Sequence, residues 1–142
     1  MLFFKLEEKV SKERKKLIKE LDKVFGDFIK ERDKFRCCIC NKTEPEVKID
    51  PGHLISRVNM ATRFDEMNCF AQCRGHNFSH EHHPEIMIQW FIHNFGIQDY
   101  DLLIYKSHHP AKFSEADLKL MIRLYKSKLN KLKELYANQT GK

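Results

Sequence analysis

Apolar residues recur with helical spacing in the N-terminal part of the chain. The successive intervals are seven, four, three and four residues, which places these side chains along one side of a helix. The stripe consists of Val10, Leu17, Leu21, Val24 and Phe28. The sequence therefore predicts an amphipathic helix over residues 7–34.

The C-terminal part predicts three more helices. Pro84 stands at the position where proline favours the first turn of a helix, and Gly96 marks the end of that helix. A short helix is expected near residues 99–105. The last helix begins at Ser114, which forms a capping-box pattern with Asp117. Its apolar stripe consists of Leu118, Ile122, Tyr125, Leu129, Leu132 and Tyr136.

Helical periodicity is lost between residue 35 and about residue 71. Residues 35–39 and 47–49 are short apolar pieces that are expected to form small strands. The sequence Asp-Pro-Gly-His at residues 50–53 is expected to be a turn. The overall class predicted is α+β, with a small central core between long helices.

The net charge of +6 is concentrated on the two flanks of the chain. Residues 1–36 carry twelve Lys and Arg against eight Asp and Glu, and residues 84–142 carry nine against six. Residues 37–83 carry five against six, and they contain all five cysteines and five of the eight histidines. This distribution favours a phosphate-bearing partner on the flanks and a metal or a reaction in the middle. Solvated lysine-rich helix faces are the alternative.

Nothing in the sequence indicates a membrane protein or a secreted one. No apolar run reaches the roughly 18–20 residues that a membrane span needs. Charge interrupts the N-terminal apolar residues too early for a signal peptide. We therefore expect a cytoplasmic protein whose five cysteines are thiolates or metal ligands rather than disulfides.

Two pairs of residues have the spacing of zinc knuckles. Cys37 and Cys40 form a C-x-x-C pair, and after 32 intervening residues Cys73 and His76 form a C-x-x-H pair. Two such pairs on one ion satisfy tetrahedral zinc, which would compensate for the few large apolar residues nearby. Cys38 in place of Cys37, and His80 in place of His76, are equally compatible with the spacing.

A zinc ion with four protein ligands is structural, so any chemistry needs a second set of residues. His53 lies midway between the knuckles, Asn68 lies five residues before Cys73, and Asn77 follows His76. These three residues have the order and spacing of an HNH motif.

The chain resembles the zinc-containing HNH, or ββα-metal, nucleases, and more closely the NinG/Rap recombination proteins of lambdoid phages. The resemblance covers roughly residues 20–135. It is carried by residues 28–33, 37–40, 52–57, 62–68 and 72–73, and by the helical tail at 95–96 and 113–132. It implies a treble-clef-like ββα-metal core at residues 35–83, between a helix at 1–34 and a helical region at 84–142, all packed as one domain.

The resemblance also implies a metal-dependent reaction on DNA. One Mg²⁺ or Mn²⁺ ion binds the scissile phosphate, and the central histidine, here His53, takes a proton from the attacking water. Asn68 is expected to orient the His53 ring through its other nitrogen. The ion is expected among Asp50, His53 and Asn77. Phosphate contacts are expected from Arg57, Arg63, Arg74 and His80.

The sequence departs from common HNH patterns at two positions. Gly52 stands where many of these nucleases have an aspartate that binds the metal, and Asp50 is expected to take over that role. His76 stands where a fourth cysteine is usual, and zinc accepts either ligand.

The resemblance therefore implies an HNH endonuclease that cleaves branched DNA, of Holliday junction or D-loop type, in phage recombination. A homodimer would account for two symmetric cuts. One alternative is a zinc-finger DNA-binding module without catalysis. Another is a zinc-organised adaptor that docks partner proteins on the helix from Leu118 to Tyr136.

Overall fold

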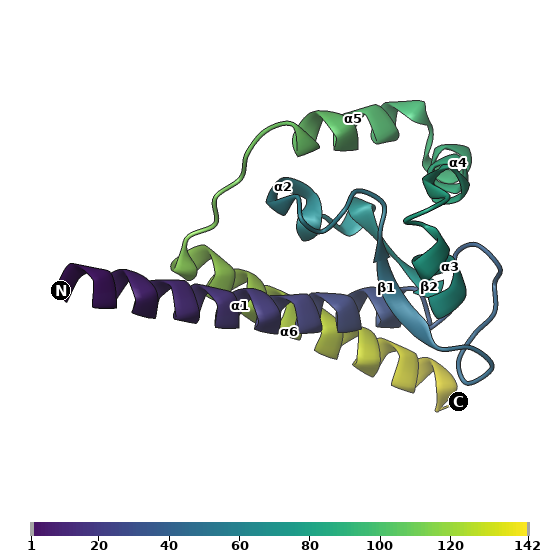
Figure 1. Cartoon of the computed structure of the whole chain (residues 1–142). Helices are drawn as coiled ribbons and strands as arrows, with labels where there is room; N and C mark the ends of the chain where they lie inside the picture. Colours follow the sequence, from purple (N-terminus) through teal and green to yellow (C-terminus); the bar gives the residue numbers. More distant parts are fainter. Residues whose placement is uncertain (1, 142) are drawn as a thin grey trace. The chain divides into compact units, whose positions relative to one another are not determined.

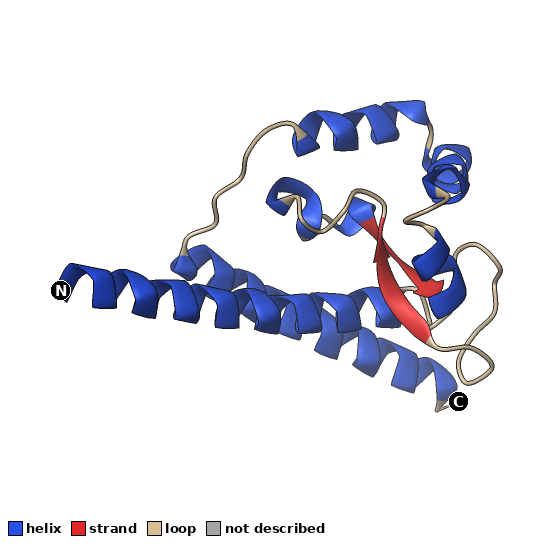
Figure 2. Ribbon diagram, in the orientation of Figure 1, coloured by secondary structure: helices blue, strands red, loops and turns tan. Residues whose placement is uncertain are grey.

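The computed structural model describes the backbone of residues 2–141 and the side chains of residues 12–141. The chain is mostly helical with one two-stranded sheet (Figures 1 and 2), so the predicted α+β class is confirmed. The elements are α1 (Leu2–Arg32), β1 (Ile49–His53), α2 (Met60–Arg63), the 3₁₀ helix η1 (Glu66–Asn68), β2 (Cys69–Cys73), α3 (Arg74–Ser79), α4 (Pro84–Phe95), α5 (Ile97–Ser107) and α6 (Glu115–Thr140). None of the described helices is both long and apolar enough to cross a membrane.

The chain divides into two compact units, Met1–Phe28 with Phe113–Lys142 and Ile29–Lys112. The first unit consists of most of α1 together with α6. Its core contains most members of the predicted apolar stripes, of which Leu17, Leu21, Val24, Phe28, Leu118, Ile122, Tyr125 and Leu129 are buried. Phe25 is buried as well, while Leu132 and Tyr136 of the predicted stripe are half-buried. The side chain of Val10 lies outside the described residues. The domain boundaries suggested at residues 34 and 83 stay a prediction.

The predicted starts of α4 and α6 and the predicted end of α4 are confirmed. Ser114 Oγ accepts a hydrogen bond from the Asp117 backbone N–H at 3.0 Å, and Asp117 Oδ2 accepts one from the Ser114 N–H at 2.8 Å. Pro84 is in the first turn of α4. Gly96 ends α4 with a φ of 93°, a conformation that favours glycine, and α5 begins at the next residue.

The second unit contains the sheet, which differs from the predicted strands: of residues 47–49, only Ile49 lies in a strand, at the start of β1. Residues 35–39 form turns with one isolated bridge, between Arg36 and Thr43. The segment 50–53 is not a turn, because it forms most of β1. Strand β1 pairs antiparallel with β2, from Ile49 opposite Cys73 to His53 opposite Cys69.

Pro51 fits in β1 because its partner residue bonds elsewhere. Pro51 lies opposite Ala71. The Ala71 N–H donates to Asp33 Oδ2 at 2.8 Å, and the Ala71 carbonyl accepts from the Cys38 N–H at 2.9 Å. Both polar groups of Ala71 therefore face away from Pro51, so the missing proline N–H leaves no acceptor without a donor.

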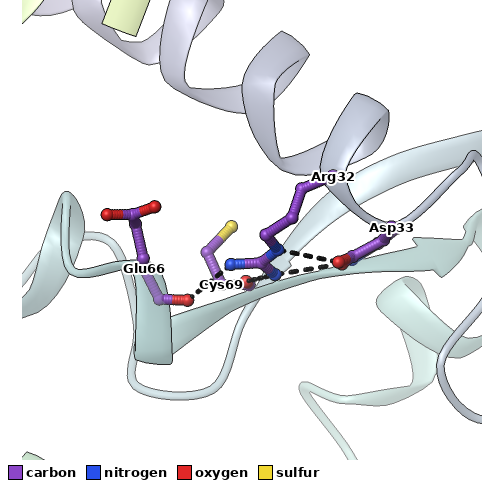
Figure 3. Close-up of polar contacts among 5 residues, drawn as sticks. Arg32, Asp33, Glu66 and Cys69 are labelled. Carbon is purple, nitrogen blue, oxygen red and sulfur yellow. Dashed lines mark hydrogen bonds and ion pairs between the residues drawn. The ribbon is translucent and has the colours of Figure 1, made fainter. Parts of the chain in front are cut away.

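Within the second unit, Arg32 and Asp33 connect the end of α1 to the sheet through hydrogen bonds (Figure 3). Arg32 Nη1 donates to the Glu66 carbonyl at 2.9 Å, and Nη2 donates to the Cys69 carbonyl at 2.8 Å. The same guanidinium binds the Asp33 carboxylate through Nε at 2.8 Å and Nη2 at 3.0 Å. Because Asp33 also binds Ala71, these contacts fix the segment that leads into the first cysteine pair.

An apolar cluster beside the sheet packs much of the rest of the second unit together. Its buried members are Leu54, Phe70, Met87, Phe91 and Leu103. The Trp90 ring packs edge-on to Phe70, with ring centroids 4.9 Å apart. Trp90 therefore packs against the core to which Phe91 belongs. Helix α3 contacts both strands.

Candidate functional site

The structure brings Cys37, Cys40, Cys73 and His76 together. Their ligand atoms all lie within 4.8 Å of one another. The Cys40 and Cys73 sulfurs are 4.0 Å apart, and His76 Nδ1 lies 3.1 Å from the Cys73 sulfur and 3.7 Å from the Cys37 sulfur. Zinc bonds of about 2.3 Å in a tetrahedron place sulfur ligands roughly 3.8 Å apart. The cluster could therefore hold a structural metal such as zinc.

Local structure explains how distant residues reach this cluster. Cys37 and Cys40 lie in the turn that follows α1, closed by a hydrogen bond from the Asn41 N–H to the Cys37 carbonyl at 2.9 Å. Cys73 ends β2 and caps α3, and His76 lies one turn into α3. The cluster therefore ties the turn after α1 to the β2–α3 junction.

The two alternatives that the spacing leaves open are not part of the cluster. Burial, together with nearby Cys37 and Asp33, raises the pKa of Cys38 to about 12, so this thiol stays protonated at neutral pH. Burial also acts on Cys37, but N–H groups of Cys40, Cys73 and Ile39 outweigh it and lower the pKa of Cys37. A metal binds the thiolate rather than the thiol, so Cys37 is the better ligand.

His80 points away from the cluster, toward the end of β1. His80 Nε2 lies 3.0 Å from the Leu54 carbonyl, to which it donates. Its Nδ1 is buried without a hydrogen-bond partner in the described part of the chain. His80 therefore braces α3 against the residue that follows His53, rather than presenting itself to a phosphate.

His53 is the last residue of β1, and its ring is hydrogen-bonded to the backbone of α2. His53 Nε2 lies 2.9 Å from the carbonyl oxygen of Arg63, the last residue of α2. Because a carbonyl only accepts, the neutral ring carries its proton on Nε2 and its lone pair on Nδ1. The arrangement presents a basic nitrogen in a fixed orientation.

The predicted contact between Asn68 and the His53 ring was wrong. Asn68 is completely buried. Its Oδ1 accepts from the Ile55 N–H at 2.7 Å, and its Nδ2 donates to the Ile55 and Thr62 carbonyls, each at 3.0 Å. Asn68 therefore joins the segment after His53 to the turn of α2 that ends at Arg63. It acts on His53 through the backbone rather than through the ring.

This arrangement predicts a large stability cost for Asn68→Ala. The change leaves the N–H and the carbonyl of Ile55 without their partner, and each costs about 1–3 kcal/mol. The Thr62 carbonyl keeps the Asp65 N–H at 3.2 Å. We expect the free energy of unfolding of the metal-loaded protein, measured in urea, to fall by about 2 kcal/mol or more. Asn94→Ala is the matched control, because Asn94 is exposed and bonds only within α4, to the Trp90 carbonyl. Equal losses in the two variants would contradict this role for Asn68.

The side chain that Gly52 lacks would point at two amide oxygens. A Cβ atom at Gly52 would lie 2.9 Å from Gln72 Oε1 and 3.0 Å from Asn77 Oδ1. Gln72 is 1% exposed, and its Oε1 has no hydrogen-bond partner within the described residues. Uncharged carbonyl oxygens are ligands that hard divalent cations accept. These donors therefore suit Mg²⁺ or Mn²⁺ chemically.

Sequence reasoning gave Gln72 no role in the site. The signal that could have identified Gln72 is its position as a polar residue in the otherwise apolar strand β2.

Asp50 lies on the same face of β1 as Gly52, because side chains alternate along a strand. Its carboxylate binds Arg74, through Nε at 3.1 Å and Nη2 at 3.4 Å. A carboxylate has two oxygens and about four acceptor positions, so Asp50 can accept from Arg74 and still bind a cation. By the same alternation His53, the last residue of β1, is on the other face of the strand.

Three cationic side chains lie beside the metal cluster, and the sequence analysis did not single out two of them, Lys42 and Lys48. A depression of about 340 Å³ is lined by Lys42, Lys48 and Arg74 next to Cys73 and His76. Lys42 and Lys48 flank the short turn between the first cysteine pair and β1, and that position is the signal that could have identified them.

Of the remaining predicted cations, Arg57 lies on the loop after β1 and Arg63 is the last residue of α2. Arg57 is exposed, and Arg63 Nη1 donates to the Arg57 carbonyl at 3.0 Å.

Comparison with known proteins gave one match. The family model described as Bacteriophage Lambda NinG protein matches residues 3–135. No curated protein and no solved structure matches the chain.

Proposed function

The chain belongs to the bacteriophage lambda NinG family, and on that basis we propose that it is an HNH endonuclease that cleaves branched DNA. The family implies a role connected with phage recombination. The substrates of this proposal are recombination intermediates of Holliday junction or D-loop type. The observation that carries it is the end of β1, where the His53 ring is fixed next to Gly52, and Gly52 faces the oxygens of Asn77 and Gln72.

His53 is the general base of the proposed reaction. Its Nδ1 takes a proton from water, the water oxygen bonds to phosphorus, and the bond from phosphorus to the leaving oxygen breaks. The Nε2–H stays bonded to the Arg63 carbonyl, which favours the protonated ring that forms. A neutral imidazole has one lone pair, so this role excludes His53 as a metal ligand in the same step.

Asn77 and Asp50 are the proposed ligands of the divalent cation, with Gln72 Oε1 beside them. The bound ion supplies stabilisation of negative charge on the phosphate and on the leaving oxygen. In-line displacement needs the base and the leaving oxygen on opposite sides of phosphorus. The end of β1 supports this division of roles, because Gly52 faces the oxygens of Asn77 and Gln72 and His53 is the next residue.

Zinc at the Cys37–Cys40–Cys73–His76 cluster is structural in this proposal. All four positions are filled by protein atoms, so the ion has no open position for a substrate. It fixes the first turn of α3 and thereby the position of Asn77, the residue after His76. The order β1, β2, α3 supports a ββα-metal core around it.

The direct test is cleavage of DNA of one sequence in several forms. We expect the wild type with Mg²⁺ or Mn²⁺ to cut four-way junctions and D-loops at least tenfold faster than linear duplex. Binding should weaken as salt rises, because phosphate contacts release counterions. Cut strands are measured on denaturing gels, and complexes on native gels without added divalent metal.

Two other results would replace the proposal. Binding without cleavage under all these conditions would favour the zinc-finger DNA-binding module, in which Asp50 serves only to orient Arg74 through their ion pair. Absence of salt-sensitive DNA binding would favour the protein adaptor.

A further inference from the structure

Phe78 is an aromatic residue of α3 that the core does not use. Its side chain is 68% exposed, while Phe70 and Phe91 are buried and pack against each other. None of the residues of α3 is buried. Since an exposed phenyl ring gains little of the stabilisation of burial, Phe78 contributes little to the core.

Phe78 contacts a histidine ring and shares its side of α3 with an arginine. Its ring lies edge-on to the His82 imidazole, with centroids 6.0 Å apart. Arg74 is one helical turn earlier, on the same side of α3, and is exposed. Asn77, the proposed metal ligand, directly precedes Phe78.

We infer that Phe78 stacks on a DNA nucleobase that is unstacked at the branch point. This contact positions the DNA strand beside Asn77. This inference rests on the proposed function. A single ring flanked by a histidine and an arginine matches the face of one base with a phosphate nearby. A protein partner is disfavoured, because its binding energy would need several apolar residues around the anchor.

The stacking also gives a reason for preferring branched DNA. A base must leave its neighbours before an aromatic side chain can cover its face, and this costs least where the base is already unpaired or at a break in stacking. In a continuous duplex the same contact would require partial unstacking at a cost of a few kcal/mol. Phe78 therefore discriminates between forms of DNA rather than between sequences.

The test uses binding without added Mg²⁺, with the structural metal retained. Four-way junctions carry 2-aminopurine at successive positions next to the branch, and a matched duplex carries it in the middle. The variants are Phe78→Ala and Phe78→Trp. Tyr105→Ala is the control, since Tyr105 is 62% exposed on α5 and also lies beside a histidine, His109, at 4.3 Å between centroids.

We expect the wild type to change the 2-aminopurine fluorescence at one position near the branch. Phe78→Ala should lose that change and bind the junction about 10- to 100-fold more weakly, the range that one stacked base provides. Its affinity for duplex should change less than twofold. Phe78→Trp should restore junction binding, and Tyr105→Ala should behave as the wild type. Matching thermal transitions show that the variants are folded.

Several results would overturn the inference. One is junction binding by Phe78→Ala equal to the wild type, and another is an equal loss in Phe78→Ala and Tyr105→Ala. A wild type that binds no DNA would remove both this inference and the proposed function. A wild type that binds junctions but does not cut them would remove only the nuclease, because the stacking is measured by binding.

Discussion

Cys37→Ala is expected to abolish binding of the structural metal and to unfold the second unit. The buried cluster at this place consists of Cys37, Ile49, Ala71 and Cys73, so two of its four members are metal ligands themselves. Structural zinc contributes about 10–16 kcal/mol to folding in small zinc domains. The remaining apolar contacts are too few to replace it. Metal content of the purified protein and the thermal transition of the second unit measure the two effects.

Cys38→Ala is the matched control for Cys37→Ala. Cys38 is the next residue along the chain, and its pKa of about 12 keeps it a thiol. It packs partly buried against the apolar cluster of Leu54 and Phe70. We expect this variant to keep one zinc per chain and to lose about 1 kcal/mol of stability, a common value for a point mutation. Equal metal content in Cys37→Ala and Cys38→Ala would remove Cys37 from the ligand set.

Metal removal should have the same effect on the wild type. A zinc chelator should eliminate the thermal transition of the second unit, while omission of Mg²⁺ should leave it intact. A chelated, metal-free protein that keeps this transition would contradict a structural metal at the cluster.

Helices and knuckles could be predicted because their signals are local. The stripe ending at Phe28 and the capping box at Ser114 depend on residues three to seven positions apart, which lie on the same helix whatever the rest of the chain does. The C-x-x-C spacing likewise brings two sulfurs to one ion within a single turn. The metal cluster then follows from two such pairs, without knowledge of the strands between them.

The strands and the role of Asn68 could not be predicted, because their causes lie far away in the sequence. Pro51 is tolerated in β1 only because Asp33 and Cys38 occupy the polar groups of Ala71. Asn68 is needed where it is because the backbone groups of Ile55 and Thr62 meet around it. Without knowledge of these distant partners, a Pro-Gly sequence such as residues 51–52 and a single asparagine such as Asn68 are both typical of turns.

His53→Ala is expected to remove cleavage while leaving DNA binding intact. A positioned general base contributes about 10²- to 10⁴-fold to a rate, so cleavage of the junction should fall by about that factor. The half-buried His53 side chain is fastened to the Arg63 carbonyl, and Asn68 holds the adjoining segments independently of the ring. The fold and the phosphate contacts should therefore survive the change. Gel assays of cleavage with Mg²⁺ and of binding without it separate the two properties.

A structural histidine would also lower activity when removed, so the base role needs a sharper measurement. Free imidazole added to His53→Ala should restore part of the cleavage rate, because it supplies a nitrogen base in the space left by the side chain. His93→Ala is the matched control, since His93 is an exposed histidine of α4, and it should cut as the wild type does, with or without imidazole. Cleavage by His53→Ala at the wild-type rate would show that another group accepts the proton. Loss of DNA binding in this variant would mean that His53 supports the surface rather than the reaction.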